Sequence, residues 1–518
     1  MAAPLDPAAM RARRWDVVVV GAGHNGLTAA AYLAAAGHSV LVLEARDLVG
    51  GACTLRQPFA DQRYLISPCA YAVGLLHPLV VEELDLRRHG YAVHLVDPHL
   101  WCPFEDGTAL TMWDDDERTA AEVARLAPGD VAGLLRYQSL FARARALLRD
   151  PAHDTWLGDA PGRDEIERLL CHDSELIDLA FSASIADVVE RHVKDERLRS
   201  ALHGQGLTGT WAGPRDSGTA AIRLMHSSGS LEGRGGAWGY VQGGMGRISF
   251  ALADAAAERG ASIATSSPVA AIMPDEGVLL ADGTTVLARA VISNADPKAT
   301  LALCRDGGSE AFRRRVAGWQ MEGPVVKVNC ALGGLPAFTA AGPGDEPHRA
   351  MVTISGGIDA TQAAYQASRA GQPAPEWCEL YFHTAYDGSV APPGKHVMSV
   401  FAQYAPLRLA EGSWPGRREQ IGDMVIAAIA RFAPGLPSLI EEREVLGPPD
   451  IEENEGLTGG HIFQGECLPG QMWQGRFAPR IPVPGVYLCG AATHPGGSVI
   501  AANGRNAAMA VAADLAAG

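Results

Sequence analysis

The stretch DVVVVGAGHNGLTAAAYLAAAG at residues 16–37 decides the fold. Its β-branched start predicts a short buried parallel strand, and its alanine-rich end predicts a helix. The glycines between them have separate uses in such a turn. Gly21 permits the tight bend, Gly23 lets the backbone approach a pyrophosphate, and Gly26 allows the helix to pack closely on the strand. Strand, glycine turn and helix in this order predict a dinucleotide-binding unit.

A second strand is expected directly after this helix. The helix should end at Gly37, and residues 39–43 (SVLVL) then form a strand that closes on Glu44. An acidic residue at that point accepts the ribose hydroxyls of a bound dinucleotide, while the N-terminus of the helix faces the phosphates. The acid therefore completes the nucleotide-binding pattern.

The same glycine spacing occurs a second time, in GQGLTG at residues 204–209. This copy follows a charged helical stretch, ERHVKDERLRSAL, and no acidic residue closes a following strand. Because the bare glycine pattern is weak without that context, we expect the second copy to be a structural loop.

A further glycine pair lies just past the ribose acid, in EARDLVGGA at residues 44–52. Its backbone amides can add contacts to a pyrophosphate, which favours FAD over NAD. The segment resembles the E-x-x-x-x-x-G-G signature of the phytoene desaturase and amine oxidase flavoprotein superfamily. The arginine that usually follows these glycines is replaced by Cys53 or displaced to Arg56.

The C-terminal segment carries the other half of the expected site. Residues 485–499 (GVYLCGAATHPGGSV) predict a strand and a glycine-rich turn, and a helix follows from about residue 501 to 515. Backbone amides and the helix dipole at such a turn favour the negative charge that reduced flavin acquires near N1 and the C2 oxygen. His494 is expected to support the turn, with a role as a base as the alternative.

This C-terminal pattern resembles the element that ends carotenoid-desaturase-like and carotenoid-isomerase-like proteins. The resemblance includes the branch of pyridine-nucleotide-disulphide-oxidoreductase-domain proteins, whose substrate is unassigned. Residues 236–246 (GAWGYVQGGMG) resemble the segment where the superfamily returns to its FAD domain. A helix over 247–260, one strand over 261–273 and a hairpin with a D-G turn (GVLLADGTTV) are expected after it.

The expected fold class is α/β. A discontinuous Rossmann-like FAD-binding domain of the glutathione-reductase and amine-oxidase type should comprise residues 12–100, 235–305 and 470–518. A mixed α+β substrate domain should comprise residues 101–234 and 306–469.

FAD is the expected cofactor, and no metal is expected. The motifs and the resemblance assign its binding to the two N-terminal glycine turns, the ribose acid, a backbone contact on the adenine side and the C-terminal turn. These residues are Gly21, Ala22, Gly23, Asn25, Gly26, Glu44, Ala45, Arg46, Gly50, Gly51, Ala52, Val269, Gly490, Ala491, Gly497, Ser498 and Val499.

Three residues are candidates for catalysis. Lys327 lies in the apolar strand GPVVKVN at residues 323–329, where an ammonium is costly unless it is paired or functional. In the amine oxidase relatives a lysine of a similar strand is linked through water to flavin N5; the alternative is an ordinary strand lysine that points outward. His461 and Glu466, in TGGHIFQGE at residues 458–466, are either an acid–base pair or satisfied structural groups.

The expected function is oxidation of a hydrophobic substrate, isoprenoid- or lipid-like, by hydride transfer to flavin N5. No second complete nucleotide fold for NAD(P)H is visible, so oxygen or a quinone is the expected electron acceptor. The alternatives are an amine or amino-acid oxidase, which Lys327 would serve equally well, and a flavin-assisted cis–trans isomerase. The apolar stretch at residues 71–86 either lines a lipophilic tunnel or forms plain core.

Composition limits the partners and the compartment. The formal net charge of −16 repels phosphate backbones, so nucleic acid is not an expected partner. The 9 cysteines never occur in C-x-x-C spacing, which disfavours a disulfide framework and fits a cytoplasmic protein. No signal-peptide pattern and no run of about 18 apolar residues occurs, so no membrane span is expected, while peripheral membrane contact stays open.

Overall fold

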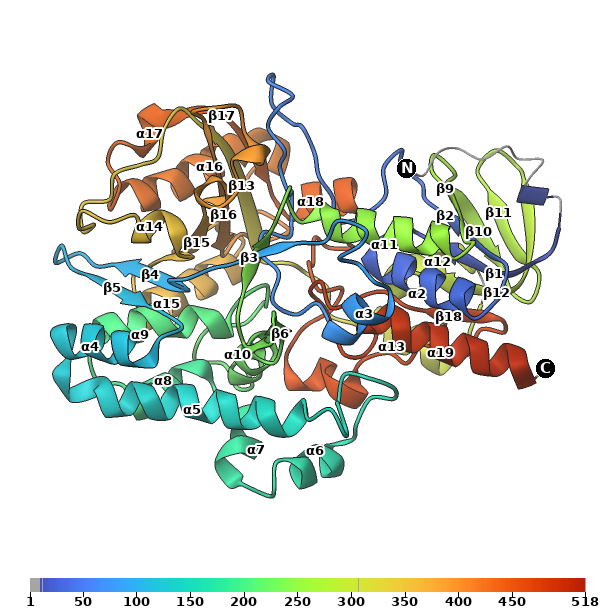
Figure 1. The fold of residues 1–518 in the computed structure, drawn as a ribbon, viewed down its shortest axis with the longest axis horizontal. Coiled ribbons are helices and arrows are strands. Elements are labelled where there is room, and N and C mark those ends of the chain that lie inside the picture. The colour runs from blue at the N-terminus through green and yellow to red at the C-terminus, as the bar shows by residue number, and fades with distance from the viewer. Residues whose placement is uncertain (1–9, 12, 306, 518) are drawn as a thin grey trace.

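A computed structural model of the chain describes residues 10–11, 13–305 and 307–517. The strands in these ranges form two seven-stranded sheets and two small two-stranded sheets. In Figure 1 the first large sheet and its helices lie at the right, the second large sheet lies at the upper left, and a group of helices lies below the second sheet.

The first sheet has a parallel core in the order β9, β2, β1, β12, β18. Its strands come from both ends and the middle of the chain: β1 Trp15–Val20, β2 Val40–Leu43, β9 Ser262–Ala264, β12 Thr285–Ser293 and β18 Val486–Leu488. Because distant segments pair in one parallel sheet, the predicted Rossmann-like α/β class is confirmed.

Both faces of this sheet are buried, as the continuous valine run of β1 predicts. Val17 and Val19 pack in one cluster with residues of α2 (His24–Ala35), α11 (Gly246–Glu258) and α19 (Ala502–Ala517). Val18 and Val20 belong to the opposite cluster. The ribbon of β10 (Val269–Met273) and β11 (Gly277–Leu280) covers this cluster together with α12 (Pro297–Leu303) and α13 (Glu310–Ala317). A helical layer and a mainly extended layer therefore enclose the sheet.

The prediction of one strand over 261–273 is wrong, because two strands occupy this range. β9 pairs with β2, whereas β10 (Val269–Met273) pairs with β11. Between them Ser266 has φ +51°, and the amides of Ser266 and Ser267 donate to the carbonyl oxygens of Arg46 and Glu44. The bend thus holds the chain against the ribose acid before Pro268, which has no amide to donate, redirects it.

The second sheet has the order β17, β13, β16, β15, β14, β4, β5, and only β14 and β4 run parallel. Its strands are β4 Leu100–Pro103, β5 Ala109–Met112, β13 Val325–Leu332, β14 Val352–Ser355, β15 Trp377–Tyr381, β16 His396–Gln403 and β17 Ile440–Leu446. One face packs on α16 (Trp414–Ala430) through residues such as Val328 and Val400. The other face presents Trp377, Tyr381 and Phe401 to the interior.

Helices below the second sheet in Figure 1 share a core with it. They are α4 Asp116–Leu126, α5 Val131–Leu148, α6 Arg163–Leu169, α7 Ser174–Phe181, α8 Ile185–His192, α9 Glu196–Leu202 and α10 Ala220–Ser227. The division into FAD-binding and substrate domains stays a prediction, and α13, beyond the boundary proposed at residue 305, packs on the first sheet. Within the described ranges no helix has the length and apolar character needed to cross a membrane.

Gly504 sets the distance between α19 and α2, because a Cβ at this position would overlap the carbonyl oxygen of Asn25. Gly504→Ala should therefore force the helices apart and lower the free energy of unfolding by about 1–3 kcal/mol. The midpoint of thermal unfolding, followed by circular dichroism, measures this loss. Gly416→Ala in α16 is the matched control, since a Cβ there meets only the Ser413 hydroxyl at 3.6 Å. Equal midpoints for the two variants would contradict the packing.

Candidate flavin site

Two glycine turns meet at the carboxyl end of β1. The amide of Gly50 donates to the carbonyl oxygen of Ala22 at 2.8 Å, and Gly23 and Gly50 form a parallel bridge. Gly21 has φ +96°, in the left-handed region that favours glycine. The two segments that the sequence suggests as phosphate contacts therefore form one backbone surface.

Close packing at this junction leaves no room for side chains. A Cβ at Gly26 would overlap the carbonyl oxygen of Gly21, so Gly26 is the helix-to-turn contact that the motif predicts. A Cβ at Gly23 would lie 2.5 Å from Asn294 Nδ2. Because Gly23 also lines a cavity, its missing side chain leaves the backbone there open to a ligand.

Glu44 stands at the end of β2, where the sequence places the ribose acid. Its carboxylate accepts hydrogen bonds from the amides of Ala22, at 2.8 Å, and Arg46, at 3.1 Å. It also lines the cavity, and a carboxylate has lone pairs left for two hydroxyl donors. Of the two positions considered for the missing arginine, Cys53 lines the cavity, whereas Arg56 pairs with Glu455 at 2.6 Å.

The C-terminal turn lies beside these glycines. Ser498, with φ +91°, Val499 and Ala491 line the cavity shortly before α19 begins. His494 does not line it and is buried, with Nε2 2.6 Å from the carbonyl oxygen of Thr155. That contact agrees with the expected supporting role of His494.

A cavity of about 1160 Å³ connects the turns with the inner face of the second sheet. The residues predicted to bind FAD that line it are Gly21, Gly23, Asn25, Glu44, Ala45, Arg46, Gly50, Gly51, Ala52, Val269, Ala491, Ser498 and Val499. The predicted residues outside its lining are Ala22, Gly26, Gly490 and Gly497. A side chain at Gly490 would overlap Gln464, and one at Gly497 would overlap Phe463. These two glycines therefore allow the turn to pack closely against its neighbours.

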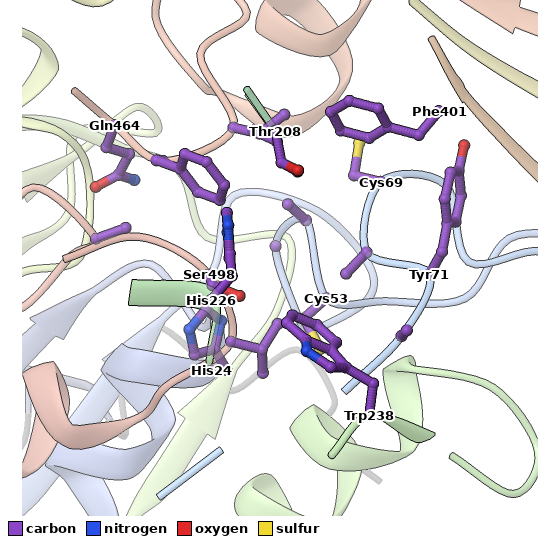
Figure 2. Close-up of a pocket in the computed structure, with 18 of the residues that line it drawn as sticks. His24, Cys53, Cys69, Tyr71, Thr208, His226, Trp238, Phe401, Gln464 and Ser498 are labelled. Atoms are coloured by element: carbon purple, nitrogen blue, oxygen red, sulfur yellow. The ribbon is translucent and has the colours of Figure 1, made fainter. Parts of the chain in front are cut away.

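The other end of the cavity is an aromatic chamber, lined by Tyr71, Trp238, Lys327, Glu379, Tyr381 and Phe401. Figure 2 shows Tyr71 and Phe401 on one side of the cavity and Trp238 below. Of the apolar stretch at residues 71–86, only Tyr71 and Ala72 reach the lining, whereas Val80, Leu84 and Leu86 belong to the core of the first sheet. The stretch is therefore mainly core.

Lys327 points into this chamber, which rules out the outward-facing alternative. Its side chain is 1% exposed, and Nζ donates to the carbonyl oxygen of Cys69 at 2.8 Å. Nζ also lies 4.3 Å from the ring centre of Tyr71 and 4.1 Å from that of Phe401. Burial lowers the pKa of Lys327 to about 7, so near neutral pH its amine exchanges a proton readily.

Glu379 is a buried carboxyl group that the sequence reasoning missed. The strand register places Lys327 and Glu379 on either side of Phe401, in one row across β13, β16 and β15. Tyr381 donates a hydrogen bond to Glu379 Oε2 at 2.7 Å. Burial raises the pKa of Glu379, against the opposing effects of Tyr381 and Lys327. A lone acid in the apolar strand WCELY was the available signal, and it is the same signal that identified Lys327.

His461 and Glu466 lie together but outside the cavity lining. His461 Nε2 is 3.5 Å from Glu466 Oε1, and both side chains are buried. Glu466 also accepts hydrogen bonds from the Thr210 hydroxyl and the Trp211 amide. The pKa of Glu466 is lowered from its ordinary value. Burial acts to raise this pKa, but the interactions with His461, the Thr210 hydroxyl and the Trp211 amide outweigh the effect of burial. The structure thus places the two side chains together outside the cavity lining, and His461 Nε2 is not hydrogen-bonded within the described residues, so their assignment to catalysis stays a prediction.

Two histidines that sequence reasoning did not select face the cavity. His24 opens α2, His226 belongs to α10, and Figure 2 shows both. Burial lowers the pKa of each to about 4, so both are neutral near pH 7. His24 Nε2 and His226 Nδ1 have no hydrogen-bond partner among the described residues. Buried polar atoms left open in this way, beside a backbone cradle, fit a polar cofactor such as FAD.

A parallel sheet with a glycine cradle, a ribose acid and a deep adjoining chamber defines a dinucleotide-dependent oxidoreductase. The chain matches the family described as "Flavin containing amine oxidoreductase" over residues 26–514 and belongs to it. The protein is accordingly an FAD-dependent oxidoreductase of the amine oxidase superfamily, as the motifs predict.

Individual relatives span nearly the whole chain. Mouse (Mus musculus) pyridine nucleotide-disulfide oxidoreductase domain-containing protein 2 is 35% identical over 97% of this chain and 94% of its own length. The lycopene-forming phytoene desaturase of Pseudescherichia vulneris is 26% identical over 93% of this chain and 95% of its own. A redesigned putrescine oxidase of known structure is 17% identical with a TM-score of 0.62, over 98% of this chain and 99% of that one. The predicted superfamily and branch are confirmed.

The lowered pKa of Lys327 has a consequence for stability. Between about pH 7 and 10.5 the unfolded chain holds a proton on this lysine that the folded chain has released. Raising the pH through this window should therefore stabilise the wild type relative to Lys327→Met. We expect Lys327→Met to have the higher thermal midpoint at pH 7 and this advantage to shrink as the pH rises.

Lys395→Met is the matched control, because Lys395 is only partly buried and pairs with Glu441. Its midpoint difference from the wild type, followed from pH 7 to about pH 9, gives the change that a lysine-to-methionine substitution produces away from the chamber. A Lys327→Met advantage that stayed constant over the same range would mean that Lys327 titrates like a solvated lysine.

Proposed function

We propose that the protein dehydrogenates a hydrophobic substrate, isoprenoid- or lipid-like, by hydride transfer to FAD. The observation that supports this most strongly is the continuity of the cavity, which runs from the glycine turns into a chamber with aromatic walls. Such walls favour an apolar chain that excludes water from the reacting carbon. Similarity to a phytoene desaturase supports an isoprenoid chain.

FAD would be held by the backbone of Gly21, Gly23, Gly50 and Gly51, by the Glu44 carboxylate and by the turn at Ser498. When bound it accepts a hydride from a substrate carbon, and oxygen or a quinone then takes up the two electrons. The N-terminus of α2 would face the phosphates of the bound cofactor, and α19 begins just past the C-terminal turn. The chain's own task is to orient the substrate and to accept the remaining proton.

Lys327 is the residue that we assign to this proton. Removing two hydrogens breaks one C–H bond with loss of a hydride and a second with loss of a proton, and a C=C bond forms. Above its pKa of about 7 the Lys327 amine has a free lone pair, while its N–H remains bonded to the Cys69 carbonyl. A base with a pKa near the working pH is the most effective one.

Amine oxidation is the second candidate. The carboxyl group of Glu379 and the faces of Tyr71 and Phe401 would attract an ammonium group, and Lys327 would serve this reaction equally well. The chamber's apolar walls favour the first candidate, because a small amine would leave most of them uncovered.

An anaerobic screen of the purified holoprotein separates these functions. Polyenes and lipids, amines and amino acids are mixed with the protein, and bleaching of the flavin band is followed together with product mass. The proposal expects bleaching by a polyene or lipid with loss of two hydrogens. Bleaching by amines alone would favour amine oxidation, whereas unchanged mass with altered double-bond geometry would favour cis–trans isomerisation. Either result contradicts the proposed dehydrogenation of a polyene or lipid.

With the substrate so identified, Lys327→Met should slow anaerobic flavin reduction by about a hundredfold, since it removes the base. The wild-type rate should rise with pH through about 7 as the lysine loses its proton, and the variant should lose this rise. Stopped-flow absorbance measures both quantities. Lys395→Met should behave as wild type, and a Lys327→Met rate within a few-fold of wild type would exclude the assigned role.

A further inference from the structure

Two arginines line the cavity between the chamber and its exposed rim. Arg145 lies on α5 and Arg223 on the neighbouring α10, and both are partly buried. The rim beyond them includes Leu135 and Arg234, which are exposed. A molecule entering from this side would pass both guanidinium groups before it reached the aromatic walls.

Neither guanidinium has a carboxylate partner in the described part of the chain. Arg145 Nη1 donates to the carbonyl oxygen of Ser227 at 3.1 Å, and Arg223 lies over the Phe141 ring, with its Nε buried and without a hydrogen-bond partner. By contrast, Arg149, the residue directly after α5, forms an ion pair with Asp154 at 2.8 Å. Two partly buried guanidinium groups without carboxylate partners repel each other and destabilise the folded protein, unless an anion binds between them.

The local fold keeps Arg145 accessible. A Cβ at Gly235 would lie 2.6 Å from Arg145 Nε, and one at Gly236 would lie 2.7 Å from Nη1. Two consecutive glycines therefore leave room for the guanidinium where it borders the cavity. This gives a reason for glycine at position 235, whereas Gly236 also has φ +75°, which itself favours glycine.

The acidic groups nearby do not compensate the arginines. Asp114, on the rim, pairs with Arg234 at 2.9 Å, and Asp116 is exposed at the start of α4. Burial raises the pKa of Glu379 against the opposing effects of Tyr381, Lys327 and Arg223, which favours the uncharged form of this carboxyl group. Burial and then the charge of Arg223 lower the pKa of His226, and burial and then the same charge lower the pKa of Arg145. A positive potential thus remains at this end of the cavity.

We propose that Arg145 and Arg223 bind the oxyanion headgroup, carboxylate or phosphate, of an amphipathic substrate whose apolar chain extends into the chamber. Guanidinium groups recognise such oxyanions with paired N–H donors. The headgroup would remain near the rim, and the chain would reach past Trp238 toward Lys327 and the flavin. This inference rests on the proposed function for its substrate class, and it narrows that class to anionic lipids or isoprenoids.

The test measures binding without turnover. Decanoate, decyl phosphate, decanol and decylamine are titrated into the FAD-loaded protein, and the perturbation of the flavin spectrum and the heat of binding are recorded. We expect both anions to bind at least about tenfold more tightly than decanol, with affinity that falls as salt is added. A preference between the two anions identifies the headgroup as carboxylate or phosphate.

Single substitutions test whether Arg145 and Arg223 are the residues that bind the anion. Arg223→Met and Arg145→Met should each weaken anion binding by about tenfold and leave decanol binding unchanged, and Arg223→Lys should retain part of the affinity. Arg143→Met is the matched control, because Arg143 lies on the same helix but points outward to Asp173. Flavin content and circular dichroism verify that each variant is folded.

Decanol binding as tight as decanoate, decylamine binding most tightly, or anion binding that survives both methionine variants would each overturn the headgroup site. Acetate is titrated as the short-chain anion, and acetate binding as tight as decanoate would overturn the role of the apolar chain. The proposed function fails by a different result: if the anions bind through the arginines but no polyene or lipid reduces the flavin, the headgroup site stands and dehydrogenation does not.

Discussion

The close approach of two backbone turns, closed by the hydrogen bond from the Gly50 amide to the Ala22 carbonyl, is the constraint on which the site depends. It requires β1 and β2 to be neighbours, and it requires α2 to start against the turn, which the absence of a side chain at Gly26 allows. Gly504 then lets α19 lie on α2, so that the last helix of the chain begins beside the first glycine turn. The distance between backbones, set by glycine, therefore makes one site from segments at opposite ends of the sequence.

Much of this site could be predicted from the sequence, because its signals are local. Strand, glycine turn and terminal acid follow one another at residues 16–44, and the C-terminal turn has its own pattern. The break between β9 and β10 was missed because its cause, the pairing of Ser266 and Ser267 with the chain around Glu44, is a tertiary contact. The composition of the chamber could not be predicted from the sequence. The register between neighbouring strands aligns Lys327 with Glu379, and spacing along the chain does not determine that register.

Charge changes along the cavity in a way that matches the proposed chemistry. Burial favours the neutral forms of His24, His226 and Glu379 and moves the pKa of Lys327 to about 7, so the inner part of the cavity carries little fixed charge. Such surroundings suit an apolar chain next to a group that takes up a proton. The arginines toward the rim lack carboxylate partners among the described residues, and an anionic headgroup would supply the missing charge there. His461 and Glu466, which are candidates from the sequence, contact each other and lie outside the cavity lining, where Glu466 accepts a hydrogen bond from the Thr210 hydroxyl.

The most direct test of the account is the affinity of the apoprotein for FAD when a single Cβ is added at Gly23. Because that Cβ would meet Asn294 Nδ2 at 2.5 Å, the substitution Gly23→Ala is made in an Asn294→Ala background, which relieves the contact within the protein. Isothermal titration should give one FAD per chain for the wild type and for Asn294→Ala. The double variant, folded by circular dichroism, should bind FAD at least about tenfold more weakly. Equal affinity of the double variant and the Asn294→Ala protein would show that the cofactor does not lie on the glycine cradle, and would contradict the account.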